Sequence, residues 1–208
     1  IAAEHRDRLI EMVGRWWAEA GKYGVMPLDG DARTRLALER PTIAAPRDSV
    51  TFYPNGSLVP FAAAPKLYNR PYSITAHVVV PEGGAEGVLI AMGGSTGGYA
   101  FFAKDQRLHF VHNYLGRDMF TVTSNADIPS GEITLRYEFE PTGEPDLAVG
   151  KGCPARGQLY INDTLVGEVD MPHTVPIMFG TEGLTCGRDS GSRVAPDAHS
   201  HARACPGT

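Results

Sequence analysis

The residues with the clearest chemical potential form a short glycine-rich segment, Gly93-Gly94-Ser95-Thr96-Gly97. It matches the Gly-x-Ser-x-Gly pattern, in which a sharp turn between a strand and a helix exposes a nucleophilic serine. Asp170 and His173 follow in the chain order that such a Ser-Asp-His hydrolase requires. The residues after Gly97, however, have the pattern of a returning strand and not of a helix. We therefore predict a hairpin loop here and no hydrolase site.

Histidines at two places have the chemistry to bind a metal ion. His109 and His112 lie three residues apart in a predicted strand, so they face opposite sides of the sheet and cannot hold one ion without a bulge. We expect both to be ordinary half-buried or surface histidines. His199, His201 and Cys205 form a better ligand set, but they lie in a tail that shows no regular pattern. We predict no metal site at either place.

The elements that would position these residues are short strands. From Val50 onward, apolar and polar residues alternate in segments that are separated by turn-forming residues, and the chain contains 24 Gly and 16 Pro. The predicted strands cover residues 73–80, 87–92, 99–103, 108–114, 119–124, 132–140, 157–162, 165–171 and 183–189. Strands of this length without intervening helices predict a two-layer antiparallel β-sandwich, similar to the jelly-roll of lectin-like and laminin-G-like domains.

Two of the connections are predicted to be tight hairpin turns. Lys104-Asp105-Gln106-Arg107 joins two of the predicted strands. For the turn near residue 163, both Asn162-Asp163 and Asp163-Thr164 are suitable central pairs, because Asn and Asp tolerate the left-handed backbone that such turns need.

The start of the chain, from about Ala3 to Gly21, predicts an amphipathic helix instead. Its apolar stripe consists of Leu9, Val13, Trp16, Trp17 and Ala20. Gly21 and Gly24 are expected to end the helix, and Pro27 to keep it from resuming. Such a stripe must lie against another surface. Packing on this chain's own sandwich and docking onto an upstream domain both remain open.

Composition and charge exclude several classes of protein. A net charge of −5, with no cluster among the 19 basic residues, argues against a nucleic-acid partner. No apolar run approaches the ~20 residues that a membrane span needs, so no membrane partner is expected. The three cysteines are widely spaced and indicate no compartment. We predict a helix and linker over residues 1–28, a connector over 29–49, a sandwich over 50–190 and an irregular tail over 191–208.

Two stretches resemble the C-terminal region of bacterial arylsulfatases of the long type. They are the segment from Trp16 to Leu28 and Gly183-Leu184-Thr185-Cys186-Gly187-Arg188-Asp189, and the resemblance extends over residues 1 to 190. It implies a mainly β accessory region of a sulfate-ester hydrolase, whose upstream catalytic domain docks on the helix that bears Trp16 and Trp17. In that family the formylglycine and the calcium ion belong to the catalytic domain. We therefore expect no catalytic, cofactor or metal residue in this chain.

One motif of that family has a partial counterpart here. Sulfatases convert the cysteine of a Cys-x-Pro-x-Arg motif to formylglycine, whose hydrate attacks the sulfate ester. This chain has Gly152-Cys153-Pro154-Ala155-Arg156, in which the proline follows the cysteine one position too early. We interpret the segment as a turn between strands that happens to contain Cys and Arg.

The end of the chain departs from the arylsulfatase-like pattern. That pattern would continue beyond Asp197 into a closing strand, whereas residues 198–208 carry no β signal. We interpret this as a truncated or frame-shifted end. It would leave an open sheet edge, through which the chain is expected to self-associate.

A stand-alone glycan-binding module is the alternative function. In that case Tyr99, Tyr114 or Phe120 would be exposed and would stack on the faces of sugar rings. The tryptophan-bearing helix argues against this alternative, because a free lectin module has no use for such a stripe.

Overall fold

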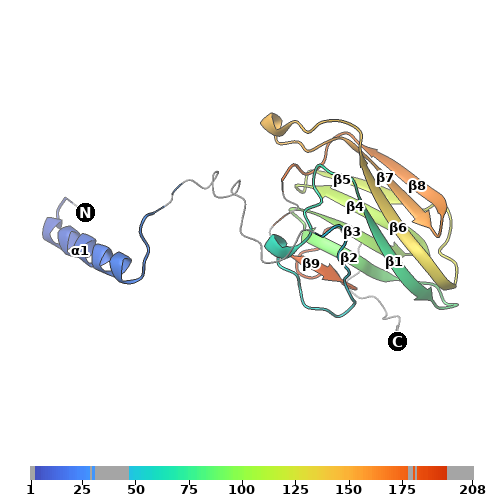
Figure 1. Ribbon diagram of the computed structural model, residues 1–208, viewed down its shortest axis with the longest axis horizontal. Coiled ribbons are helices and arrows are strands. Elements are labelled where there is room, and N and C mark those ends of the chain that lie inside the picture. The colour runs from blue at the N-terminus through green and yellow to red at the C-terminus, as the bar shows by residue number, and fades with distance from the viewer. Residues whose placement is uncertain (1–2, 29, 31–46, 178–179, 181, 196–208) are drawn as a thin grey trace. The chain divides into compact units, whose positions relative to one another are not determined.

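The computed structural model describes residues 3–28, 30, 47–177, 180 and 182–195 (Figure 1). It divides into a helical unit, residues 1–48, and a second unit, residues 49–208. The second unit is built from two antiparallel sheets, and one helix precedes it along the chain. The predicted fold class, a mainly β sandwich preceded by one amphipathic helix, is confirmed.

The helix, α1, spans Arg6–Lys22 and so begins later than predicted and continues past Gly21. Tyr23 ends it: the Tyr23 N–H donates to the carbonyl oxygen of Glu19 at 3.0 Å, and the Gly24 N–H donates to that of Gly21 at 3.4 Å. Gly24 follows in the left-handed region, at φ +62°, which glycine adopts without strain. Within the described part of the chain, no helix is both long and apolar enough to cross a membrane.

The two sheets contain four and five strands. The first has the order β1-β6-β7-β8, and the second has the order β5-β4-β3-β2-β9 (Figure 1). The strands are β1 (Tyr72–Val80), β2 (Gly87–Gly94), β3 (Gly97–Lys104), β4 (Arg107–Tyr114), β5 (Asp118–Thr123), β6 (Gly131–Pro141), β7 (Ala155–Ile161), β8 (Thr164–Met171) and β9 (Leu184–Cys186). Two short 3-10 helices lie at Phe61–Ala63 and Leu147–Val149. Every predicted strand is present, but β9 is much shorter than the predicted 183–189.

Tight turns join the hairpins where the sequence predicts them. Asp105 and Gln106 connect β3 to β4 with φ of 50° and 62°, the backbone that matches the twist of the flanking strands. Of the two alternatives near residue 163, the chain uses Asn162-Asp163, with Asn162 at φ 53°. Ser95 and Thr96 form the turn between β2 and β3, so the predicted hairpin at the glycine-rich segment is confirmed.

Aromatic rings hold the two sheets together. Phe110 of β4 stacks on Tyr137 of β6, with ring centroids 3.4 Å apart and an angle of 8° between the planes. Both side chains have no measurable exposure. Strand alternation also directs Ile133, Leu135 and Phe139 of β6 into this core. Each fully buried side chain of this size contributes about 1.5–3 kcal/mol of hydrophobic stabilisation.

A second apolar cluster covers the opposite face of the five-stranded sheet. Side chains from β2, β3 and β4 pack there with two residues from the end of the described chain; the members are Val88, Ala91, Ala100, Phe102, Val111, Val194 and Ala195. Val194 has no exposed surface. Residues 191–195 form no strand, yet they supply part of this cover, which no pattern in the sequence indicates.

Candidate functional site

The densest group of chemically capable side chains lies where β4, β5 and the segment after β8 meet. His173 is 2.9 Å from a carboxylate oxygen of Asp118, measured from its Nε2. Its ring lies edge-on to Tyr114, at 4.5 Å between centroids, and to Phe120, at 5.2 Å. The side chain of His173 is only 14% exposed, whereas that of Asp118 is 51% exposed. The histidine is therefore held in place by two rings and oriented by one carboxylate.

His112 lies deeper in the same region and is 1% exposed. Its Nε2 accepts a hydrogen bond from the backbone N–H of Val175 at 3.2 Å. Burial, and then the neighbouring His173, lower the pKa of His112 from 6.5 to about 3. It is thus neutral around pH 7. Our expectation of a half-buried or surface residue is wrong for His112, because the side of β4 that carries Phe110 faces the core.

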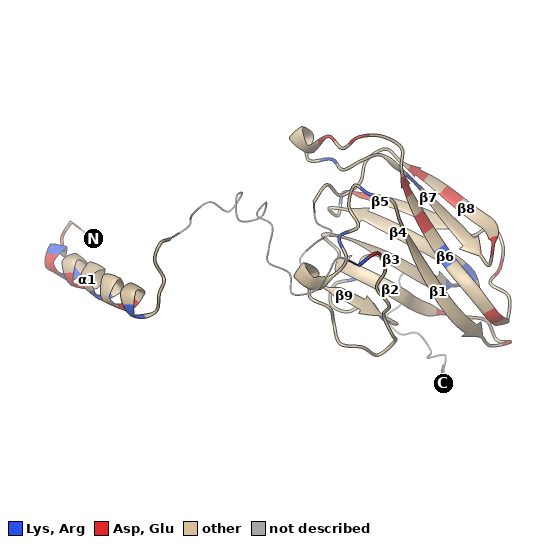
Figure 2. Ribbon diagram, viewed as in Figure 1, with Lys and Arg blue, Asp and Glu red and all other residues tan. Residues whose placement is uncertain are grey.

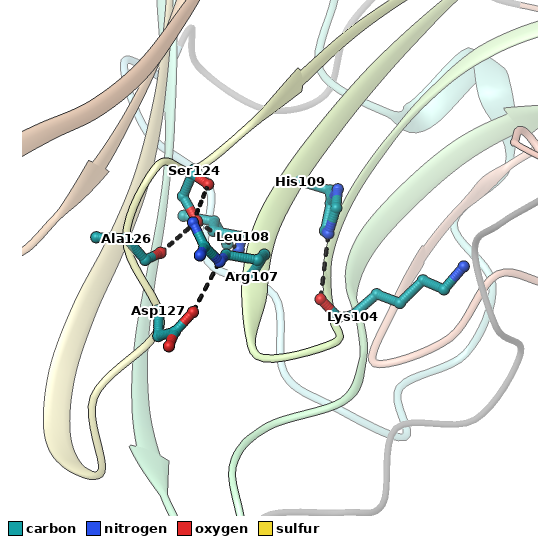
Figure 3. Close-up of polar contacts among 7 residues, drawn as sticks. All are labelled: Lys104, Arg107, Leu108, His109, Ser124, Ala126 and Asp127. Atoms are coloured by element: carbon teal, nitrogen blue, oxygen red, sulfur yellow. Dashed lines mark hydrogen bonds and ion pairs between the residues drawn. The ribbon is translucent and has the colours of Figure 1, made fainter.

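His109 lies on the other side of β4 and is half-buried, as expected. Its Nε2 is 3.2 Å from the carbonyl oxygen of Lys104 (Figure 3). Its Nδ1 is 3.0 Å from the hydroxyl of Thr123. The two histidines therefore do not share a ligand position. In the part of the chain that the structure describes, no group of three or more His, Cys, Asp or Glu residues is placed to hold a metal ion.

The three residues of the hydrolase-like pattern each have a different partner. The backbone N–H of Ser95 donates to the hydroxyl of Ser192 at 3.0 Å. Asp170 forms a salt bridge with Arg156 at 2.8 Å on the surface, and His173 pairs with Asp118. A catalytic triad needs its histidine bonded to its serine and its acid at the same time, so this chain does not assemble one from these residues.

Figure 3 shows a polar clamp at the start of β4. Arg107 forms a salt bridge with Asp127 at 2.7 Å and donates to the carbonyl oxygen of Ser124 at 3.0 Å. The Ser124 hydroxyl accepts the Leu108 N–H at 3.0 Å and donates to the carbonyl oxygen of Ala126 at 2.7 Å. These contacts hold the segment after β5 against the β3–β4 hairpin. The polar groups of Arg107, Ser124 and Asp127 are therefore bonded to one another or to backbone groups, and the clamp is structural.

Cys153 lies in a buried environment that disfavours the reactive thiolate form. It is 1% exposed, and burial raises the pKa of its thiol. Its N–H donates to the side-chain oxygen of Asn69 at 2.9 Å, and its carbonyl oxygen accepts from the Thr174 hydroxyl at 2.7 Å. Arg156 belongs to β7 and not to a turn. The segment therefore does not fit a formylglycine site, which would have to meet substrate.

The aromatic residues of the predicted glycan site are mostly buried. Tyr99 is 1% exposed and Tyr114 is 6% exposed, while Phe120 is half-buried. Tyr99 stacks with Phe110 in the core, and the hydroxyl of Tyr114 donates to the carbonyl oxygen of Gly150 at 2.9 Å. The prediction that Tyr99 and Tyr114 are exposed stacking residues is wrong, because strand alternation puts them on the inner side of the sheet.

The helical unit presents a different kind of surface. Six large apolar residues of α1 are exposed, and we call them the docking face: Leu9, Ile10, Met12, Val13, Trp16 and Trp17. Trp16 is 43% exposed and Trp17 is 56% exposed, with ring centroids 4.9 Å apart. At 100° per residue these positions occupy one arc of roughly 160° around the helix. The stripe predicted from the sequence did not include Ile10 and Met12, which widen it.

No protein-family model matches this chain, and no curated protein matches it. The local geometry of the described residues is therefore the basis for a functional proposal.

In the second unit, then, a ring nitrogen of each of His109, His112 and His173 and the carboxylate of Asp170 have partners within the fold. The tail residues His199, His201 and Cys205 lie outside the described residues, as does most of the predicted connector over 29–49. Among the described elements, α1 carries the greatest number of exposed large apolar side chains, those of the docking face.

Proposed function

We propose that this chain is a C-terminal accessory β-sandwich of an arylsulfatase-like enzyme. In this proposal the parent activity is sulfate-ester hydrolysis, and a catalytic domain upstream of α1 supplies the formylglycine and the calcium ion. The observation that carries the proposal is the docking face, because it belongs to the segment whose residues resemble the arylsulfatase pattern. The sandwich would cover or shape the active site and would contribute no reacting atom.

The charge pattern of α1 favours a protein partner over a lipid surface. Residues Arg6–Lys22 carry four basic and three acidic side chains. Arg8 and Arg15 both pair with Glu11, at 2.6 and 3.0 Å, which neutralises the polar side of the helix. Helices that bind membrane surfaces have an excess of Lys and Arg on that side. Exposed tryptophans are also the residues that most often dominate protein–protein binding.

The first experiment is to read the genomic DNA immediately upstream of the codon for Ile1. We expect an open reading frame, continuous with this chain, that encodes a Cys-x-Pro-x-Arg motif. An in-frame stop codon directly before that codon would reject the arylsulfatase proposal.

The second experiment measures hydrolysis of 4-nitrophenyl sulfate. We expect none by this chain alone, and activity by the full-length product. Trp16→Glu with Trp17→Glu should lower the activity of the full-length product by about tenfold or more, because a charge at the centre of an apolar interface is strongly unfavourable. Ala18→Glu is the matched control, since Ala18 is exposed on the polar side of the same helix.

Two outcomes would contradict the proposal. Hydrolysis by this chain alone would mean that it contains a catalytic centre. Equal activity of the tryptophan variant and the Ala18→Glu control would mean that the docking face does not hold the catalytic domain. Retention of this chain on immobilised glycans would support the glycan-binding alternative instead.

A further inference from the structure

The segment that follows β8, residues 172–176, joins the two sheets at one end of the sandwich, and we call it the bridging segment. On one side it contacts residues that precede β1 and β7, two strands of the four-stranded sheet. The Thr174 hydroxyl donates to the carbonyl oxygen of Cys153 at 2.7 Å. The side-chain N–H of Asn69 donates to the carbonyl oxygen of Pro176. None of the groups in these contacts titrates in acid.

The packing on this side is close because position 152 is a glycine. The Gly152 N–H donates to the carbonyl oxygen of Thr174 at 2.8 Å. A Cβ atom on Gly152 would lie 2.7 Å from the carbonyl oxygen of Val175 and 2.8 Å from the Thr174 hydroxyl, so a larger residue does not fit. The bridging segment is therefore firmly attached to the loop before β7, through contacts that do not depend on pH.

On its other side, the bridging segment contacts the five-stranded sheet through two histidines. The backbone N–H of Val175 donates to Nε2 of His112, in β4, at 3.2 Å. Nε2 of His173 lies 2.9 Å from a carboxylate oxygen of Asp118, in β5, and its ring is edge-on to Tyr114. Both polar contacts on this side therefore involve an imidazole ring.

The two histidine contacts respond differently to acid. A protonated imidazole donates from both ring nitrogens, so His173 can still donate to the Asp118 carboxylate when it is charged. That carboxylate is 51% exposed, and an exposed contact of this kind contributes little. Nε2 of His112, by contrast, must be unprotonated to accept the Val175 N–H. Protonation turns it into a donor and leaves two donors facing each other.

The surroundings of His112 oppose a charge on its ring. The elements packed around it present these titratable groups: Tyr99 of β3, Asp118 of β5, Tyr72 of β1, Tyr137 of β6, Cys153 of the loop before β7, and His173. The tyrosines and Cys153 are neutral in acid, since burial raises the pKa of each. Asp118, the one carboxylate among them, already pairs with His173.

The other charged side chains of the four-stranded sheet do not face His112. Strands β6, β7 and β8 carry several Lys, Arg, Asp or Glu residues (Figure 2). These residues alternate with the buried ones along each strand and so lie on the outward side of the sheet. The net result is that burial, and then His173, lower the pKa of His112 to about 3.

Withdrawal of the bridging segment from β4 would relieve this restraint. His112 would then regain contact with water, and its pKa would return toward the ordinary 6.5. Between the two values, the open form binds a proton that the closed form does not, so acid favours opening by up to about tenfold per pH unit. Opening one segment exposes far less apolar surface than unfolding both sheets, so it needs less free energy.

We propose that His112 is a pH-sensitive switch, which holds the bridging segment against the five-stranded sheet near neutral pH and releases it in acid while the sandwich stays folded. The contacts with Asn69, Gly152 and Cys153 keep the released segment on the four-stranded sheet. The switch does not involve α1, so it does not depend on the proposed sulfatase function.

The test is amide hydrogen exchange of the full chain, measured by NMR between about pH 7 and about pH 5 and corrected for the intrinsic pH dependence of exchange. The opening constant of the Val175 N–H should rise by up to about tenfold per pH unit below 6.5. The reference is the N–H of Asn125, which donates to the carbonyl oxygen of Val166 at 2.6 Å and contacts no histidine in that bond. Its opening constant should stay unchanged.

Two variants separate His112 from other histidines. His112→Gln retains a side-chain acceptor but does not titrate, so the opening constant at Val175 should become independent of pH. His77→Gln is the matched control, because His77 is exposed on β1 and pairs with Thr134. It should keep the wild-type pH dependence. Far-UV circular dichroism verifies that each variant is folded.

Three outcomes would overturn the proposal. The first is an opening constant at Val175 that does not change in acid. The second is an equal rise at Val175 and Asn125, because the sandwich would then be unfolding as a whole. The third is a folded His112→Gln variant that keeps the wild-type pH dependence. The first two comparisons use the wild-type chain alone, so they decide the question even if His112→Gln does not fold.

Discussion

Helix α1 and strand β4 both carry large apolar residues at the spacing of their own secondary structure, yet their exposure is opposite. Leu108 and Phe110 of β4 have no exposed surface, whereas Trp16 and Trp17 of α1 are 43% and 56% exposed. The difference is that β4 has a second sheet facing it, from which Tyr137 stacks on Phe110. Periodicity thus identifies the side of an element that must be covered. It does not identify the element that covers it.

The same contrast appears within one sheet. β1 and β6 are neighbours with alternating patterns, but the inward side chains of β1 before Val80 are half-buried, whereas those of β6 are buried. Position at the edge, and not composition, makes the difference. Among the described residues, β1 and α1 therefore both carry apolar side chains that the fold leaves partly or largely exposed.

The largest effect is expected from the core. Phe110→Ala should lower the free energy of unfolding by about 3–5 kcal/mol, since it removes the ring between Tyr99 and Tyr137 and leaves a cavity. Urea denaturation followed by far-UV circular dichroism measures this loss. A decrease below ~1 kcal/mol would mean that the two sheets do not depend on this stack.

The next largest effect is expected from Asn113, which links the segment containing Val194 to the end of β2 and the turn after it. The side-chain N–H groups of Asn113 donate to the carbonyl oxygens of Gly94, Ser95 and Val194 at 3.0–3.2 Å. Asn113→Ala leaves these buried acceptors without that donor and should cost about 2–3 kcal/mol. Asn125→Ala is the control, because that residue is exposed and its bond to β8 uses the backbone. Equal losses for both variants would refute this role of Asn113.

The pH dependence of stability should reveal His112. Its pKa is about 3 in the folded protein and 6.5 as the ordinary value, so between these values the unfolded chain binds a proton that the folded chain does not. The contribution of His112 to the free energy of unfolding is therefore fully present above about pH 6.5. It is lost as the pH decreases, by up to about 1.4 kcal/mol per pH unit. Denaturation at several pH values should show a shallower decline for His112→Gln.

That experiment needs a control for another histidine, His77, and for a carboxyl group with a shifted pKa, Asp189. His77 is exposed, so His77→Gln should leave the decline unchanged. Burial raises the pKa of Asp189, which contributes with the opposite sign: its stabilisation is present at low pH and is lost as pH rises above 3.8. Comparing each variant with the wild type at the same pH removes this contribution. An identical decline in the His112→Gln variant would show that His112 is not the cause.

The smallest effect is expected from the docking face. Trp17→Ser should change the free energy of unfolding of the sandwich by less than about 0.5 kcal/mol, because the side chain is more than half exposed. Trp16 and Trp17 are the two tryptophans of the chain, so tryptophan fluorescence reports α1 alone. We expect the emission of a water-exposed indole in the isolated chain. A strongly blue-shifted emission would contradict this.

The sequence by itself determined the elements. Every predicted strand from β1 to β9 is present, and the Asp105-Gln106 turn and the amphipathic helix also lie where they were predicted. These features depend on residues that are close together in the chain. Alternation, turn-forming residues and helical spacing are local properties, so they can be recognised without knowing what an element contacts.

The tertiary structure alone decided which side of each strand is inside and which side chains meet. His112, Tyr99 and Tyr114 were expected at or near the surface, but the opposing sheet made their side of the strand the interior. His173 pairs with Asp118, 55 residues away, and Asn113 bonds to Val194, 81 residues away. Contacts of this separation arise only when the sheets pack, and no spacing in the sequence encodes them.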